Sequence, residues 1–122
     1  MKTVPVSNHD NKMFAHALEA ARLGEHERVR VGAILERGKH RLINHNRISH
    51  GYEGPYKVGH AERRVIAGVS AIKHTLYVVR IGLNEEPLAS WPCDECMVHI
   101  VACGCVNKIV YHDGTEVRKV RI

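Results

Sequence analysis

The segment TLYVVRIGLNEEPLASWPCDECMVHIVACGCVNKIVYH, residues 75–112, contains two strand patterns with a helix pattern between them. Residues 75–81 form the most apolar strand pattern of the chain and predict a strand in the middle of a sheet. A loop is predicted over 82–91, a helix over 92–103 and a second strand over 106–112. A helix that lies between two strands is typical of α/β folds.

Turn and cap residues mark the ends of these elements. Pro92 is predicted at the first helical position and Gly104 just past the helix end, which are the places that these residues favour. The dipeptide Asp-Gly at 113–114 predicts a tight turn, and residues 115–122 predict a last strand. Because the turn is so short, we expect this last strand to run antiparallel to the strand before it.

The sequence upstream predicts a helix, a hairpin and another helix. Residues 8–23 carry apolar side chains at helical spacing. The candidates for the N-cap of this helix are Asn8 and Asp10. Strand patterns over 29–36 and 40–46 predict a hairpin that turns at Gly38. A further helix is predicted over 60–73, after a loop rich in glycine.

Together these elements predict a three-layer α/β/α sandwich around a mixed five-stranded sheet, because helices and strands alternate along the chain. The chain has 122 residues, which is the usual length of one domain. We therefore expect a single domain over residues 1–122.

Composition argues against a membrane-spanning or disulfide-rich protein. The chain has no run of about 18 apolar residues, and its N-terminal residues lack the apolar core of a signal peptide. Its four cysteines all lie between Cys93 and Cys105, too few for a disulfide scaffold. We expect a soluble, cytoplasmic protein, in which clustered cysteines more often bind metal or do chemistry than form bridges.

Positive charge is concentrated in the first half of the chain. The net charge is +5, and residues 1–65 contain 12 Lys and Arg against 7 Asp and Glu, whereas residues 66–122 contain 6 of each kind. Such an excess favours an anionic partner, either a nucleotide phosphate or a polynucleotide. A solvated basic surface explains the same charge equally well.

Cys93 and Cys96 are the clearest candidates for metal ligands. Residues three apart lie on one face of a helix, and the N-terminal end of a helix favours thiolates. A catalytic zinc ion needs only one further protein ligand, because water holds its fourth position. His60 can supply that ligand, and Glu62 can act as a general base beside the metal without binding it.

Two other kinds of site can use such a cysteine pair. A closed structural zinc site needs a fourth protein ligand, but Cys103 lies about 10 Å beyond Cys96 along the helix. A redox pair leaves His60 and Glu62 unexplained. A catalytic zinc is therefore the favoured interpretation, and Cys103 and Cys105 are expected to be small buried residues at the helix end.

The motif HAE at 60–62, followed by PCDEC at 92–96, resembles the H-x-E…P-C-x-x-C signature of the zinc-dependent nucleobase deaminases, which include the cytidine and deoxycytidylate deaminases. The resemblance extends over residues 8–115 in the same order. It implies a bound Zn²⁺ and a hydrolytic deamination. Water activated by zinc would attack the ring carbon that carries the amino group, Glu62 would transfer the protons, and ammonia would leave.

The resemblance also implies residues that contact the substrate. Asn46, at the end of the predicted second strand, would hold the sugar. The base pocket would be lined by the backbone at Ala61 and around Val31 and Ala33.

Aromatic residues near the two motifs are further candidates. Ser90-Trp91-Pro92-Cys93 resembles the corresponding segment of polynucleotide-editing cytosine deaminases, so Trp91 can stack on a base or pack under its own loop. Tyr52 and Tyr56 have the same two interpretations. The neighbouring residues Arg63 and Arg64 can contact phosphate or lie exposed on a helix.

The predicted reaction converts a cytosine nucleotide or nucleoside, with a deoxycytidine nucleotide favoured, to its uracil form. A small domain offers little surface for a polynucleotide, and the basic first half suits a phosphate. One alternative is deamination of cytosine or adenine in single-stranded DNA or RNA. Another is a zinc-binding module without catalysis, against which Glu62 argues. The resemblance further implies a homo-oligomer.

Overall fold

The computed structural model describes residues 1–24, 30–45, 47–48, 58–59 and 73–122. Seven strands form one mixed sheet in the order β1-β9-β8-β6-β2-β3, with β7 paired to β6, and β4 pairs separately with β5. The described elements are β1 (Lys2–Val4), α1 (Asn8–Ala21), β2 (Arg30–Arg37), β3 (His40–His45), β4 (Arg47–Ile48), β5 (Val58–Gly59), β6 (His74–Ile81), β7 (Pro87–Leu88), α3 (Asp94–Cys103), β8 (Val106–His112) and β9 (Val117–Arg121).

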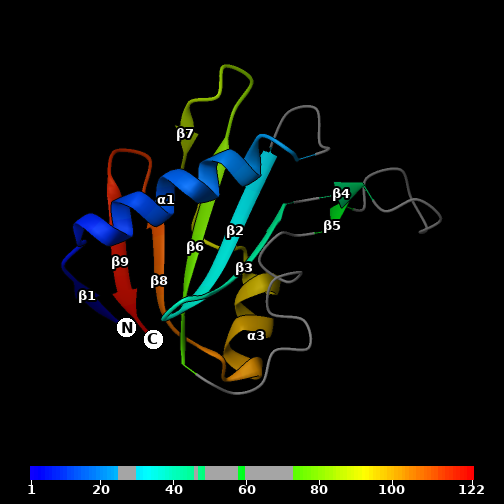
Figure 1. Cartoon of the computed structure of the whole chain (residues 1–122). Helices are drawn as coiled ribbons and strands as arrows, with labels where there is room; N and C mark the ends of the chain where they lie inside the picture. The colour runs from blue at the N-terminus through cyan, green and yellow to red at the C-terminus, as the bar shows by residue number, and fades with distance from the viewer. Residues whose placement is uncertain (25–29, 46, 49–57, 60–72) are drawn as a thin grey trace.

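Helices α1 and α3 pack on opposite faces of this sheet (Figure 1). Along β6, Leu76 and Val78 belong to the core on the side of α3, whereas Tyr77, Val79 and Ile81 belong to the core under α1. Side chains of a strand alternate between faces, and β6 is buried on both faces because it lies in the middle of the sheet. The predicted three-layer α/β/α sandwich with this central strand is confirmed.

The two predicted strand directions, those of the first hairpin and of the last strand, are also confirmed, and the structure adds a parallel pair. β6 and β8 run parallel, and α3 lies in the connection between them. β2 and β3 form the expected antiparallel hairpin, in which Gly38 adopts a φ of 59°. β9 runs antiparallel to β8, so the sheet is mixed.

The sheet contains seven strands instead of the five predicted. β1 is three residues long and pairs with β9, and β7 is two residues long and pairs with the end of β6. Runs this short show no alternation of apolar and polar residues, so the sequence pattern cannot reveal them. The helix predicted over 60–73 lies outside the described residues except for Lys73.

The N-cap of α1 is Ser7, so the prediction of Asn8 or Asp10 is wrong. The Ser7 hydroxyl accepts a hydrogen bond from the Asp10 backbone N–H at 3.1 Å, and the Asp10 carboxylate accepts one from the Ser7 N–H at 2.9 Å. This reciprocal pair is a capping box, in which Asp10 takes the third helical position instead of the cap. In the part of the chain that the structure describes, no helix is long and apolar enough to cross a membrane.

Helix α1 approaches the sheet closely at Gly32 of β2. A Cβ atom at this position would overlap with the Ala17 carbonyl oxygen and the Ala21 backbone nitrogen. Only glycine permits this approach, and the two alanines are completely buried. Because neighbouring strand residues face opposite sides, Val31 and Ala33 face the core on the side of α3.

A buried polar network joins the start of α1 to the sheet. Asp10, which is 2% exposed, accepts hydrogen bonds from the Tyr77 hydroxyl at 3.1 Å and from Lys119 Nζ at 2.8 Å. The Tyr77 hydroxyl also lies 3.4 Å from Glu36, which pairs with Arg41 at 3.0 Å. Burial alone raises the pKa of Asp10, but the hydrogen bonds from Lys119, Ser7 and Tyr77 outweigh it and leave the pKa lowered.

Replacing Lys119 by methionine is expected to lower the free energy of unfolding at pH 7 by roughly 3 kcal/mol, because a buried carboxylate loses its cation. The lowered pKa of Asp10 means that its stabilising effect is complete above the unfolded-state pKa of about 4 and is lost as the pH falls through the lower folded-state value. The variant should therefore differ less from the wild type at pH 2 than at pH 7.

Urea unfolding at a series of pH values from 2 to 7 measures this difference. Lys12→Met removes a lysine from the exposed side of α1 and serves as the control. Zinc release at low pH affects all three proteins alike, so the difference between their curves reports the pair. A destabilisation of Lys119→Met that is equal at all pH values would contradict the role given to Asp10.

Candidate metal centre

Cys93 and Cys96 lie at the N-terminal end of α3. Cys93 is the N-cap, with φ −64° and ψ 163°, and its carbonyl oxygen accepts a hydrogen bond from the Met97 N–H at 2.8 Å. The prediction that Pro92 occupies the first helical position is wrong, because the extended backbone of Cys93 delays the helix until Asp94. Pro92 is instead buried just before the cap.

The C-terminal end of α3 is as predicted. Gly104 follows the last helical residue with a φ of 64°, a left-handed conformation that glycine adopts without a steric penalty. The helix therefore has defined ends, and the two cysteines occupy its cap and its third position.

The two thiols differ in their exposure to solvent. Cys93 is exposed, whereas Cys96 is completely buried. None of the four cysteines forms a disulfide. The positive end of the helix dipole favours the negative charge of thiolates at both positions. An ion held between them would lie at the boundary of core and solvent, where water and a substrate can reach it.

This donor set fits zinc. Thiolates are preferred zinc ligands, and a catalytic site adds one imidazole and leaves one position open. In the described ranges, no three side chains of His, Cys, Asp or Glu gather into a group that could hold a metal ion. The other predicted members of the site lie outside these ranges. They are His60, Glu62, Asn46, Ala61, Tyr52 and Tyr56.

Ser90 fixes the chain just before the cysteines. Its hydroxyl donates a hydrogen bond to the Val78 carbonyl of β6 at 2.8 Å and accepts one from the His112 N–H of β8 at 2.8 Å. Its own N–H donates to the His112 carbonyl at 2.9 Å. Ser90 is 3% exposed. One side chain therefore ties the loop to two neighbouring strands and sets the place where α3 begins.

Replacing Ser90 by alanine is expected to lower the free energy of unfolding by about 1–3 kcal/mol, because it removes the side-chain partner of the Val78 carbonyl and of the His112 N–H. Zinc affinity should also fall, since Cys93 is only three residues away. Urea unfolding with a chelator present measures the first effect, and a competitive zinc titration measures the second. Thr115→Ala, in the exposed turn before β9, should change neither quantity. Wild-type values for Ser90→Ala in both measurements would refute the anchoring role.

Trp91 lies between this serine and the cysteines. Its ring packs edge-on against the ring of Tyr111, with centroids 4.8 Å apart and planes at 70°. The residue is still 37% exposed, while Tyr111 packs on the core beneath α3. The structure therefore gives Trp91 a packing partner and leaves part of its surface open to a ligand.

The predicted pocket residues of β2 lie on the same side of the sheet as α3. Ala33 is completely buried in the core there, together with Leu35 and Ile100, and Val31 is partly buried against that core. The structure thus brings Val31, Ala33 and the helix that carries the cysteines to one face.

Cys103 and Cys105 lie at the other end of α3. The Cys103 thiol donates to the Ile100 carbonyl at 3.1 Å and accepts a hydrogen bond from the Cys105 N–H at 3.2 Å. Burial, together with the hydrogen bond and charge of Cys103, raises the pKa of Cys105 to about 12. A thiol whose pKa is raised this far gives up its proton to a metal less readily than an ordinary cysteine does, so Cys105 is the poorer zinc ligand. Cys105 is completely buried, as predicted, whereas Cys103 is only partly buried against the same core.

The sequence did not predict Ser90 as an anchor or Tyr111 as the partner of Trp91. A single serine in a loop has no pattern that distinguishes an anchor from a solvated side chain. Tyr111 belongs to a strand pattern, which predicts burial but names no partner. Both roles depend on contacts between segments that are 12 to 22 residues apart, and such contacts are decided by tertiary structure.

Comparisons with known proteins give matches to a family model and to solved structures. A family model described as the cytidine and deoxycytidylate deaminase zinc-binding region matches residues 7–113. Among solved structures, the apo form of dCMP deaminase from the cyanophage S-TIM5 is similar in fold, with a TM-score of 0.60 and 18% sequence identity over 82% of each chain. No curated protein matches the chain.

Proposed function

Because this chain belongs to the family of cytidine and deoxycytidylate deaminases that share a zinc-binding region, we propose that Cys93, Cys96 and His60 bind its zinc and that Glu62 carries the protons of the reaction. The predicted family, the zinc cofactor and the class of enzyme, a zinc-dependent deaminase, are confirmed by the family match. The start of α3 is the observation that supports the metal ligands, since it places two cysteines at the cap and third position of one helix.

The chemistry follows from these roles. Zinc, when bound, would activate a water molecule for attack on the ring carbon that carries the amino group. Cys93 and Cys96 would hold the metal where the helix dipole favours their negative charge. The Glu62 carboxylate would take a proton from the water and deliver protons to the ring nitrogen and the leaving amine, so that ammonia departs.

For the substrate, we propose a cytosine nucleotide, with a deoxycytidine nucleotide favoured. A nucleotide carries the phosphate that the basic first half of the chain suits. The solved structure with a similar fold is a dCMP deaminase by its description, which supports the same choice. We also propose that residues 1–122 form one deaminase domain and that the enzyme assembles as a homo-oligomer.

A second substrate class is single-stranded DNA or RNA. The exposed part of Trp91, held by Tyr111 beside the cysteines, is the observation that favours it. Successive bases of a single strand stack on such aromatic side chains. A base in a duplex is out of reach for this chemistry unless it is flipped out.

A deamination panel tests these proposals. Zinc-loaded protein would be incubated with cytosine, cytidine and deoxycytidine, with their mono- and triphosphates, with the adenine and guanine counterparts, and with a single-stranded oligonucleotide. Mass spectrometry detects the replacement of an amino group by an oxygen. Glu62→Ala protein serves as the blank.

The panel separates the alternatives. Conversion of a free deoxycytidine nucleotide alone supports the favoured substrate. Conversion of the oligonucleotide alone would show that the substrate is single-stranded nucleic acid. Trp91→Ala should then raise KM for the oligonucleotide. A zinc-replete protein that converts none of these compounds would be a binding module without catalysis, and the role proposed for Glu62 would be wrong.

A further inference from the structure

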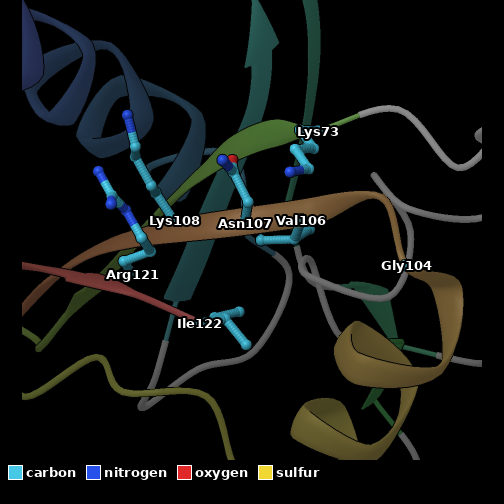
Figure 2. Close-up of a pocket in the computed structure, with 7 residues that line it drawn as sticks. All are labelled: Lys73, Gly104, Val106, Asn107, Lys108, Arg121 and Ile122. Atoms are coloured by element: carbon cyan, nitrogen blue, oxygen red, sulfur yellow. The ribbon is translucent and has the colours of Figure 1, made fainter. Parts of the chain in front are cut away.

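A basic cavity lies at the end of the sheet where α3 leads into β8 (Figure 2). Its volume is about 410 Å³, which is within the range of small-molecule sites. Three of its lining residues are cations, and the described lining contains no acidic side chain. The lining residues are Lys73, Lys108, Arg121, Asn107, Gly104, Val106 and Ile122.

Two of these cations belong to a row of like charges across three neighbouring strands. Lys108 of β8 lies directly opposite Arg121 of β9, and Arg121 lies directly opposite Lys2 of β1. The side chains of Lys108 and Arg121 extend in the same direction (Figure 2). Neighbouring strands are about 4.8 Å apart, so the three residues span about 10 Å. We call Lys2, Arg121 and Lys108 the basic row.

Like charges that lie directly opposite each other in a sheet are destabilising. In this respect the basic row differs from two other cations of β9, which have carboxylate partners. Lys119 pairs with Asp10 at 2.8 Å, and Arg118 pairs with Asp113 at 2.6 Å. Among the described residues, no carboxylate forms an ion pair with the basic row or with Lys73. A bound anion would supply the missing negative charge.

We propose that this cavity binds phosphate groups, supplied either by a free polyphosphate such as a nucleoside triphosphate or by the backbone of a single-stranded nucleic acid. The Arg121 guanidinium can grip phosphate oxygens with two N–H donors. Lys73 and Lys108 add point charges, and the Asn107 amide adds a neutral donor. Lys2 does not line the cavity, but the basic row continues from the cavity to Lys2 on the edge strand β1. Its length of about 10 Å suits a ligand with two or more phosphates, which extends beyond the cavity along the row, better than a single anion.

The cavity is distinct from the candidate metal centre. Gly104 lines the cavity and follows the last residue of α3, whereas Cys93 precedes the first residue. A helix of ten residues is about 15 Å long. The phosphate site therefore does not depend on the proposed deaminase function, and one experiment can fail while the other succeeds.

Binding of tripolyphosphate and of an oligothymidylate to the zinc-loaded full chain tests the proposal. Calorimetry would follow tripolyphosphate, and fluorescence anisotropy would follow the labelled oligonucleotide, each at several salt concentrations. Lys108→Gln and Arg121→Gln should each weaken binding by about 10-fold. Each should also make the slope of log K against log salt shallower by about one for the oligonucleotide. Lys12→Gln removes the same charge from α1 and should leave affinity unchanged, apart from a small effect of net charge.

Stability in phosphate-free buffer gives an independent readout. Removing one cation from a repulsive row should raise the midpoint of thermal unfolding by about 1–4 °C, so that weaker binding cannot be explained by a damaged fold. If only the affinity for tripolyphosphate depends on Lys108 and Arg121, the ligand is a free polyphosphate. If only the affinity for the oligonucleotide depends on them, the ligand is a nucleic-acid backbone. Absence of binding, or equal affinities for the wild type and both variants, would overturn the proposal.

Discussion

Glu62→Ala protein is expected to bind zinc as the wild type does and to lose about 10²- to 10⁴-fold in kcat on the converted substrate. The reason is that the role proposed for this carboxylate is to carry protons and not to bind the metal. Zinc content by atomic emission and turnover by mass spectrometry measure the two quantities on the same preparation. The separation of metal content from activity is the signature of this role.

His60→Ala is the matched comparison, because this residue lies two positions away and is proposed as a ligand. It should lose both the zinc and the activity. Loss of zinc from Glu62→Ala would make Glu62 a ligand, and retention of full zinc by His60→Ala would remove the third ligand. Either result would contradict the proposed assignment.

Cys93→Ala and Cys96→Ala are each expected to reduce zinc from about one ion per chain to almost none and to abolish deamination, because a zinc site that loses a thiolate loses most of its affinity. In the absence of metal, the two variants should differ in their free energy of unfolding. Cys93 is exposed and Cys96 is completely buried. Cys96→Ala should therefore lower the free energy of unfolding of the metal-free protein by about 1 kcal/mol through lost packing, whereas Cys93→Ala should hardly change it.

Cys105→Ala is the control for the cysteine pair. Its thiol is as fully buried as that of Cys96, but it lies beyond the opposite end of α3, and its pKa is raised to about 12. This variant should lose some stability and keep its zinc. If Cys105→Ala released zinc while Cys93→Ala retained it, the metal centre would lie at the C-terminal end of α3, and the proposed ligands would be wrong.

Periodicity in the sequence was sufficient for the long elements. The apolar run of β6 predicted a central strand because a strand in the middle of a covered sheet is buried on both faces. The helix of residues 94–103 was predicted from its apolar residues and Gly104, although its start was misplaced by two residues because the backbone conformation of Cys93 leaves no trace in the composition. β1 and β7 were missed because two or three residues have no period.

The chemistry was likewise readable from spacing at some residues and not at others. Cys93 and Cys96, three residues apart after a proline, form together with the HAE motif at 60–62 a pattern that resembles a known signature, and this resemblance was enough to indicate the family. The anchor at Ser90 and the contact between Trp91 and Tyr111 join segments that the chain brings together only on folding.

The sequence by itself thus determined the α/β alternation, the zinc-dependent chemistry and the positive charge, since each depends on residue type and local spacing. Only the tertiary structure decided that Ser90 ties two parallel strands together and that Lys2, Arg121 and Lys108 lie side by side. Positions 2, 108 and 121 are brought into register by the pairing of β1, β9 and β8. Pairing across a sheet depends on hydrogen bonds between distant segments, and no local pattern specifies which residues will then face each other.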